Sequence, residues 1–86
     1  MNRRKLLKSL SEGHLKNVAF DDFTNLVEGF GFILLRIRGS HHIYGHPEVS
    51  ELGNLQDVKG EVKAYQARQF LKLVERYNIT MEQDNE

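Results

Sequence analysis

Residues 32–45 of this 86-residue chain are FILLRIRGSHHIYG, and this stretch decides the fold that the sequence predicts. Its first half alternates between the two faces of a strand, with Ile33, Leu35 and Ile37 on one face and Leu34, Arg36 and Arg38 on the other. Gly39 and Ser40 are typical turn residues, and His41–Gly45 has the length of a returning strand. The stretch therefore predicts a β-hairpin with a short loop.

Helical periodicity flanks this hairpin on both sides. Before the hairpin, apolar residues recur at helical spacing from about Phe20 to Glu28, with two aspartates in the first turn, where the helix dipole favours acids. After the hairpin, the same spacing runs from Ala64 to Tyr77. Gly31 and Asn78 follow the last periodic residues, and residues of this kind typically end a helix.

Three further segments complete the expected order of elements. Residues 3–10 carry leucines at helical spacing between basic residues and predict a short amphipathic helix, which Ser11-Glu12-Gly13 ends. Residues 48–53 have the composition of a loop. Residues 54–56 predict a weak third strand.

These elements predict a protein of the α+β class. A three-stranded antiparallel sheet has to bury one face, and only the helices at 20–28 and 64–77 have apolar surfaces large enough to cover it. The result is a two-layer sandwich. We expect its other sheet face to stay wet and to carry Arg36 and Arg38.

Composition points to one small intracellular domain. Cysteine is absent, which excludes disulfides and cysteine-based zinc sites and favours a reducing compartment such as the cytoplasm. No apolar run follows the basic N-terminus as in a signal peptide, and none is long enough to span a membrane. We expect one domain over residues 1–79, with an extension helix within 1–12 and a disordered acidic tail at 80–86.

Charge is unevenly distributed along the chain, although the net charge is zero. Residues 1–47 carry seven Lys/Arg against four Asp/Glu, whereas residues 48–86 carry five against eight. Either the surface is mixed and solvated, or a basic half of the protein meets an anion. Neutral net charge argues against a protein that coats nucleic acid non-specifically, but it is compatible with a local phosphate site.

Three of the four histidines lie between positions 41 and 46, and three interpretations of this cluster are open. A shared metal ion is disfavoured, because His42 and His46 lie about 13 Å apart on a strand that rises about 3.3 Å per residue, and zinc–nitrogen bonds are about 2 Å long. His41 also points to the opposite face from His42. The second interpretation is that the cluster is only the polar end of an exposed hairpin. The third is that it performs acid/base chemistry on RNA.

RNA cleavage is the interpretation that gives a role to the histidines and also to the arginine, glycine, serine and tyrosine residues beside them. Attack of a 2′-hydroxyl on the adjacent phosphate needs a base that titrates near neutrality, which histidine provides, and cations for the charge that builds on phosphorus. Gly39 lets the backbone approach a phosphate, and Ser40 adds a hydroxyl donor. An aromatic residue can stack on an unpaired base. The expected RNA contacts are Arg36, Arg38, Gly39, Ser40, His42 and Tyr44.

The order of these motifs resembles the HicA family, the mRNA interferase toxins of type II HicAB toxin–antitoxin modules. The resemblance lies in Gly39-Ser40-His41-His42-Ile43-Tyr44, which follows Gly29-Phe30-Gly31-Phe32 and a strand ending in Arg36-Ile37-Arg38. Residues 63–71 also resemble the final helix of one branch of the family, so the likeness covers about residues 17–79. The N-terminal helix and the additional His42 and His46 depart from the family pattern.

This resemblance implies a double-stranded-RNA-binding-domain-like fold, α-β-β-β-α, and cleavage of mRNA without a metal or another cofactor. It implies that His41 is the catalytic histidine, which His42 or His46 could assist. It also implies a HicB-type antitoxin, which we expect to cover the strand face that bears Arg36, Arg38 and His41. A non-catalytic RNA-binding or protein-docking module of the same fold is the alternative.

Overall fold

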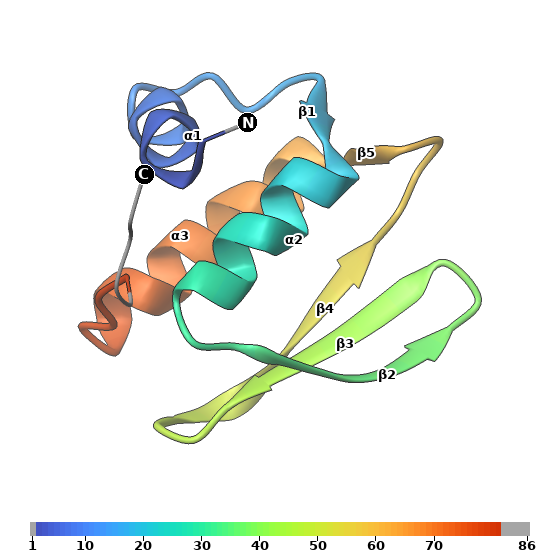
Figure 1. Cartoon of the computed structure of the whole chain (residues 1–86), viewed down its shortest axis with the longest axis vertical. Helices are drawn as coiled ribbons and strands as arrows, with labels where there is room; N and C mark the ends of the chain where they lie inside the picture. Colours follow the sequence, from blue (N-terminus) through green and yellow to red (C-terminus); the bar gives the residue numbers. More distant parts are fainter. Residues whose placement is uncertain (1, 82–86) are drawn as a thin grey trace.

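The computed structural model describes residues 2–81, and Figure 1 shows how their helices and strands are arranged. In chain order the elements are α1 (Arg3–Ser11), β1 (Val18–Ala19), α2 (Phe20–Gly29), β2 (Ile33–Arg38), β3 (His41–His46), β4 (Val49–Gln56), β5 (Glu61–Val62) and α3 (Ala64–Arg76). Strands β2, β3 and β4 form an antiparallel sheet in that order, and β1 pairs with β5 in a separate short ribbon. The α+β class and the three-stranded antiparallel sheet are confirmed.

The third strand of the sheet is longer than the sequence predicted. We expected a loop at 48–53 and a strand of three residues after it, but β4 begins at Val49 and runs for eight residues. Val49 already pairs with His46 across the turn. The segment is a strand because it pairs with β3, and its own composition gives little indication of this. The two-residue strands β1 and β5 were not predicted, because so short a strand leaves no periodic signal.

The three helices described in residues 2–81 end in the same way. The residue after each C-cap has a positive φ, and these residues are Gly13, Gly31 and Asn78. At the end of α2, the Gly31 N–H donates to the Glu28 carbonyl (2.9 Å) and the Phe32 N–H donates to the Val27 carbonyl (3.4 Å), which is the Schellman pattern. The helix ends predicted from glycine and asparagine are therefore confirmed.

A cluster of phenylalanines joins α2 and α3, which cover one face of the sheet (Figure 1). Phe70 of α3 packs edge-on against Phe23, Phe30 and Phe32, with ring centroids 5.5, 5.6 and 5.3 Å away. Such T-shaped pairs are favourable beyond the area that they bury. Because Phe30 ends α2 and Phe32 leads into β2, Phe70 fixes the angle at which the chain passes from the helix layer into the sheet.

The N-terminal helix belongs to the core of the protein. Leu6 and Leu10 of α1 are buried, and α1 lies against α2 on the side away from the sheet (Figure 1). Arg3 donates to Asn25 Oδ1 from Nε (3.1 Å) and from Nη2 (2.8 Å). The Arg3 stem lies so close to α2 that a Cβ at Gly29 would be 2.9 Å from Arg3 Cδ.

Two expectations concern the rest of the chain. Residues 82–86, most of the tail that we expected to be disordered, lie outside the described residues. Among the helices found in residues 2–81, none combines the length and the hydrophobicity needed to cross a membrane.

Replacing Phe70 by alanine tests the aromatic cluster. Removing a buried phenylalanine leaves a cavity where three rings now pack, so we expect the free energy of unfolding to fall by about 3–5 kcal/mol. The control is Tyr65→Ala on the same helix, where the side chain is 50% exposed; it should change stability by no more than about 0.5 kcal/mol. Urea unfolding followed by circular dichroism measures both changes, and equal effects of the two substitutions would contradict a central role for Phe70.

Candidate active site on the open face of the sheet

The open face of the sheet is the side that α2 and α3 do not cover. Arg38 of β2 pairs with His41 of β3, and Arg36 pairs with Ile43. Residues that pair across an antiparallel ladder point to the same face, and His41 and Ile43 share a face because side chains alternate along β3. Arg36, Arg38 and His41 therefore lie together on the open face, as the sequence predicted.

A β-bulge at Leu35 changes the faces predicted for the first half of β2. The register shifts between Leu34 and Arg36, so Leu35 is an extra residue without a partner in β3. Leu34 pairs with the buried Tyr44 and faces the helices, whereas the prediction placed it beside Arg36. Leu35 lies over Gly45, where a Cβ would be 2.9 Å from Leu35 Cδ1. The predicted alternation is wrong across the bulge, and the open face is partly apolar instead of wet.

The ring of His41 is held by Asn54, a partner that the sequence did not indicate. His41 Nδ1 lies 3.0 Å from Asn54 Oδ1. An amide oxygen can only accept a hydrogen bond, so this contact requires the proton on Nδ1 and leaves Nε2 of the neutral ring with a free electron pair. In this tautomer Nε2 is able to act as a general base.

The register between β3 and β4 brings Asn54 to His41. His41 pairs with Gln56, and Ile43 pairs with Asn54, so Asn54 is the diagonal neighbour of His41 on the same face. The end of β4 is in turn tied to α3 by the buried Gln66, which donates to the Asn54 carbonyl (3.3 Å) and accepts from the Gln56 N–H (2.9 Å). No local pattern marks Asn54, because its role depends on the pairing of two strands.

The turn before His41 places backbone and hydroxyl groups beside the ring. Gly39 has a φ of 58°, as the first central residue of a type II′ hairpin turn requires. Ser40 Oγ accepts from Gln56 Nε2 at 3.4 Å, and the Ser40 carbonyl accepts from the Asp57 N–H at 2.9 Å. The structure thus brings Gly39 and Ser40 next to the basic pair and His41, and the short hairpin loop is confirmed.

The other two histidines of the cluster face the helices. The ring centroid of His42 lies 4.8 Å from that of Phe20, and the ring centroid of His46 lies 4.9 Å from that of Phe32. Both phenylalanines are buried. His42, which we expected to contact RNA, and His46 therefore do not share a face with His41. Across residues 2–81, no three His, Cys, Asp or Glu side chains come together in a group that could hold a metal ion.

Tyr44 is buried, so its position does not suit the stacking role that we expected for it. Tyr44 is 3% exposed, and its hydroxyl donates to Glu28 Oε2 at 3.4 Å. Burial, and next the negative charge of Glu28, raise the pKa of the Tyr44 hydroxyl above its usual 10.0. The physical reason is the alternation of side chains along β3: Tyr44 shares a face with His42, so its ring points toward the helices.

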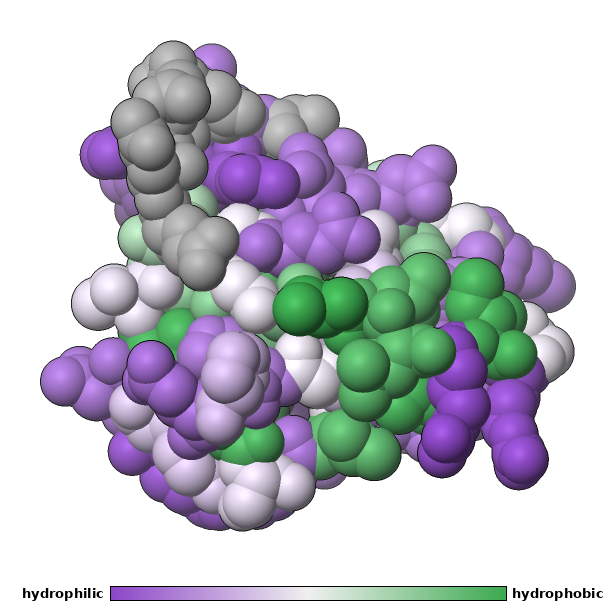
Figure 2. All heavy atoms as spheres, turned by 60° about the horizontal axis from the view of Figure 1, so that its bottom comes forward, coloured by the Kyte–Doolittle hydropathy of each residue, from purple (hydrophilic) through white to green (hydrophobic). Residues whose placement is uncertain are grey.

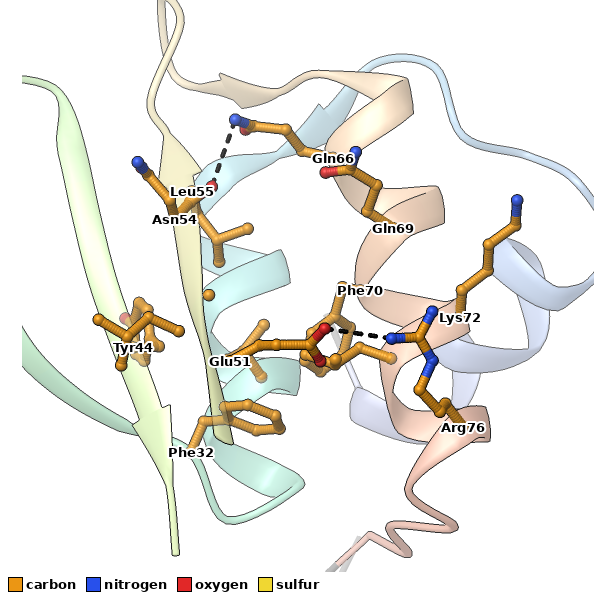
Figure 3. Close-up of a pocket in the computed structure, with 14 residues that line it drawn as sticks. Phe32, Tyr44, Glu51, Asn54, Leu55, Gln66, Gln69, Phe70, Lys72 and Arg76 are labelled. Carbon is orange, nitrogen blue, oxygen red and sulfur yellow. Dashed lines mark hydrogen bonds and ion pairs between the residues drawn. The ribbon is translucent and has the colours of Figure 1, made fainter. Parts of the chain in front are cut away.

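A slot of about 320 Å³ lies between β4 and α3 (Figure 3). Aromatic and aliphatic side chains line much of it. Glu51 and Arg76 form an ion pair of 3.1 Å at the slot, and Gln66 reaches across to the Asn54 carbonyl. Glu51, Arg76 and Gln66 are thus already paired within the protein, and they are less available to a substrate than the side chains of the open face.

No protein-family model, curated protein or solved structure matches this chain. The residues of the open face are therefore the basis on which a function can be proposed. They combine one oriented imidazole, two guanidinium groups and an exposed turn, which is a set suited to a phosphate ester.

Replacing Tyr44 by phenylalanine tests the buried hydroxyl through the pH dependence of stability. A raised pKa means that the wild type keeps its full stability below the unfolded pKa of about 10 and loses stability as the pH rises through the higher folded value. Phenylalanine cannot ionise. The free energy of unfolding of Tyr44→Phe minus that of the wild type should therefore increase from neutral pH to about pH 11. Urea unfolding over this range measures the difference, with Tyr65→Phe as the exposed control; a difference that does not change with pH would contradict the assignment.

Proposed function

We propose that this protein is an endoribonuclease that cleaves mRNA without a metal ion and uses His41 as general acid and base. The observation that carries the proposal is the contact of His41 Nδ1 with Asn54 Oδ1, which in the neutral ring leaves the electron pair of Nε2 free, on the same face as Arg36 and Arg38. An oriented imidazole beside two permanent cations meets the needs of a 2′-hydroxyl attack on a phosphodiester.

The proposed reaction begins when Nε2 of His41 accepts the proton of the 2′-hydroxyl as its oxygen attacks the adjacent phosphorus. Negative charge builds on the non-bridging phosphate oxygens, and Arg36 and Arg38 stabilise it. The bond from phosphorus to the 5′ oxygen then breaks, and the imidazolium of His41 returns a proton to the leaving oxygen. The products are a 2′,3′-cyclic phosphate and a free 5′-hydroxyl.

The resemblance to the HicA family supports the same reaction and suggests its biological setting. Gly39, Ser40 and His41, which carry the resemblance, stand together at the hairpin turn. Apart from the two-residue strand β5 between β4 and α3, the order α2-β2-β3-β4-α3 is the one that a double-stranded-RNA-binding-domain-like fold requires, and this supports the proposal. We therefore propose a cytoplasmic toxin of a type II toxin–antitoxin module, with mRNA as its substrate and a HicB-type antitoxin as its partner.

A non-catalytic RNA-binding or protein-docking module is the second candidate. The observation in its favour is the exposed apolar part of the sheet, where Ile33 is 61% and Leu35 is 56% exposed. Phosphoester chemistry has no use for such side chains. A module of this kind would bind RNA or protein and leave RNA intact.

Replacing His41 by alanine tests the proposed chemistry. The purified wild type, incubated with a single-stranded mRNA fragment in excess EDTA, should produce fragments that end in a cyclic phosphate. Because the variant lacks the group that moves the proton, its cleavage rate should fall by about 10²–10⁴. Gel electrophoresis of end-labelled RNA measures the rate.

The matched control is His42→Ala, which removes the neighbouring imidazole from the opposite face and should retain most of the activity. Circular dichroism verifies that both variants are folded. An intact RNA after incubation with the wild type would favour the binding module, and full cleavage by His41→Ala would remove the catalytic role from that residue.

Asn54 should act as a positioning residue for His41. Without the amide, the ring has no fixed orientation, so Asn54→Ala should lower kcat/KM by up to about a hundredfold. Asn54→Asp keeps an acceptor but adds a negative charge that stabilises the protonated ring, so the acidic limb of the pH–rate profile should move to higher pH. A profile of Asn54→Asp that coincides with that of the wild type would show that Asn54 does not act through His41.

A further inference from the structure

Strand β2 is exposed along its whole length. Figure 1 shows it as the edge strand of the sheet, with its hairpin extending beyond α2 and α3. All six residues of β2 are exposed, including Leu34 (38%) and Ile37 (54%), which point to the helix side of the sheet. The helices therefore leave β2 uncovered on both faces, and the strand combines a free edge with apolar side chains.

The apolar surface of β2 continues across the open face. Leu35 and Leu52 both lie over Gly45, where a Cβ would be 2.9 Å from Leu35 Cδ1 and 3.7 Å from Leu52 Cδ2. Figure 2, which brings the lower side of Figure 1 forward, shows a continuous hydrophobic surface beside strongly hydrophilic side chains. A connected apolar patch of this kind on a small domain marks an interaction surface.

The free edge determines how a partner can bind. No strand described in residues 2–81 pairs with β2 on the side away from β3. An unpaired edge presents a row of backbone N–H and C=O groups, to which an extended segment can add as a further strand. The side chains of that segment would then meet the apolar residues of β2.

The charge of the hairpin selects the partner. Strands β2 and β3 contain Arg36, Arg38 and three histidines and no aspartate or glutamate. A second copy of β2 would bring four arginines into one ribbon without a single carboxylate, and like charges across strands are unfavourable. An added strand with acidic residues near Arg36 and Arg38 would instead form opposite-charge pairs.

We propose that β2 receives an extended segment of another protein as a fourth strand of the sheet. The segment carries apolar residues opposite Ile33–Leu35 and acidic residues opposite Arg36 and Arg38. This inference uses only the edge, the patch and the charge of the hairpin, so it does not rest on the proposed nuclease activity. The added strand would border the pair of Arg38 and His41, and it would thereby limit access to the open face.

The test uses synthetic peptides and the whole isotope-labelled protein. The probe is an eight-residue peptide that alternates valine and threonine and has two glutamates near its N-terminus, where an antiparallel pairing brings them opposite Arg38 and Arg36. A second peptide has lysines in place of the glutamates. A third has the glutamates but carries N-methyl groups along its backbone, which remove the N–H donors that a strand needs.

Titration followed by NMR measures the site and the Kd. The glutamate peptide should shift the amide signals of β2 in a saturable way and should bind about tenfold more tightly than the lysine peptide, with a difference that shrinks as salt is added. The N-methylated peptide should not bind. In the double variant Arg36→Gln, Arg38→Gln the preference for the glutamate peptide should disappear.

Two further variants test whether binding depends on the apolar side chains of β2 or on exposed apolar side chains anywhere on the protein. Ile33→Ser combined with Leu35→Ser should weaken binding of the glutamate peptide by about tenfold, because it removes two exposed apolar contacts. Tyr65→Ser removes a large side chain that is 50% exposed from α3, outside the sheet, and should leave binding unchanged.

Four results of the titrations would overturn the proposal. These are the absence of any peptide binding, equal binding of the glutamate and lysine peptides, binding of the N-methylated peptide, and shifts centred outside β2. Sedimentation of the protein alone is the remaining measurement: a dimer that dissociates in the Ile33→Ser, Leu35→Ser variant would identify a second copy as the occupant and would also overturn it. Because all of these readouts measure binding, their failure leaves the proposed role of His41 to be decided by RNA cleavage.

Discussion

The packing of Phe70 against Phe23, Phe30 and Phe32 is the interaction on which the rest of the structure depends. It holds α3 against α2 and fixes the chain at the point where it leaves α2 and enters the sheet. The Schellman motif at Gly31 supplies the turn at this point, and the aromatic contacts set its direction. The hairpin of β2 and β3 extends from this anchor, so its geometry follows from the packing of the helix layer.

A chain of contacts connects that core to the open face. Gln66 lies four residues before Phe70 on α3 and bonds the backbone of β4 at Asn54 and Gln56. Asn54 then orients His41. A buried amide that lost these bonds would carry a desolvation cost of about 1–3 kcal/mol, so the position of α3 and the orientation of the histidine are coupled.

The hairpin combines two kinds of surface. Near the turn it is basic, with an oriented imidazole, whereas near its start it is apolar with an unpaired edge. The bulge at Leu35 separates the two parts, because it turns Leu34 toward the helices while Arg36 and Arg38 stay on the open face. A phosphate ester suits the first part and an extended polypeptide suits the second, so one ligand can affect the binding of the other.

The sequence by itself determined the three helices, their ends and the hairpin at Gly39, because helical periodicity, residues that tolerate a positive φ and turn chemistry act over a few neighbouring positions. It also placed Arg36, Arg38 and His41 on one face. Only the tertiary structure decided the extent of β4, the bulge at Leu35, the burial of Tyr44 and the contact of Asn54 with His41. The reason is that strand register depends on residues far apart in the chain, and one inserted residue moves the side chains before it to the opposite face.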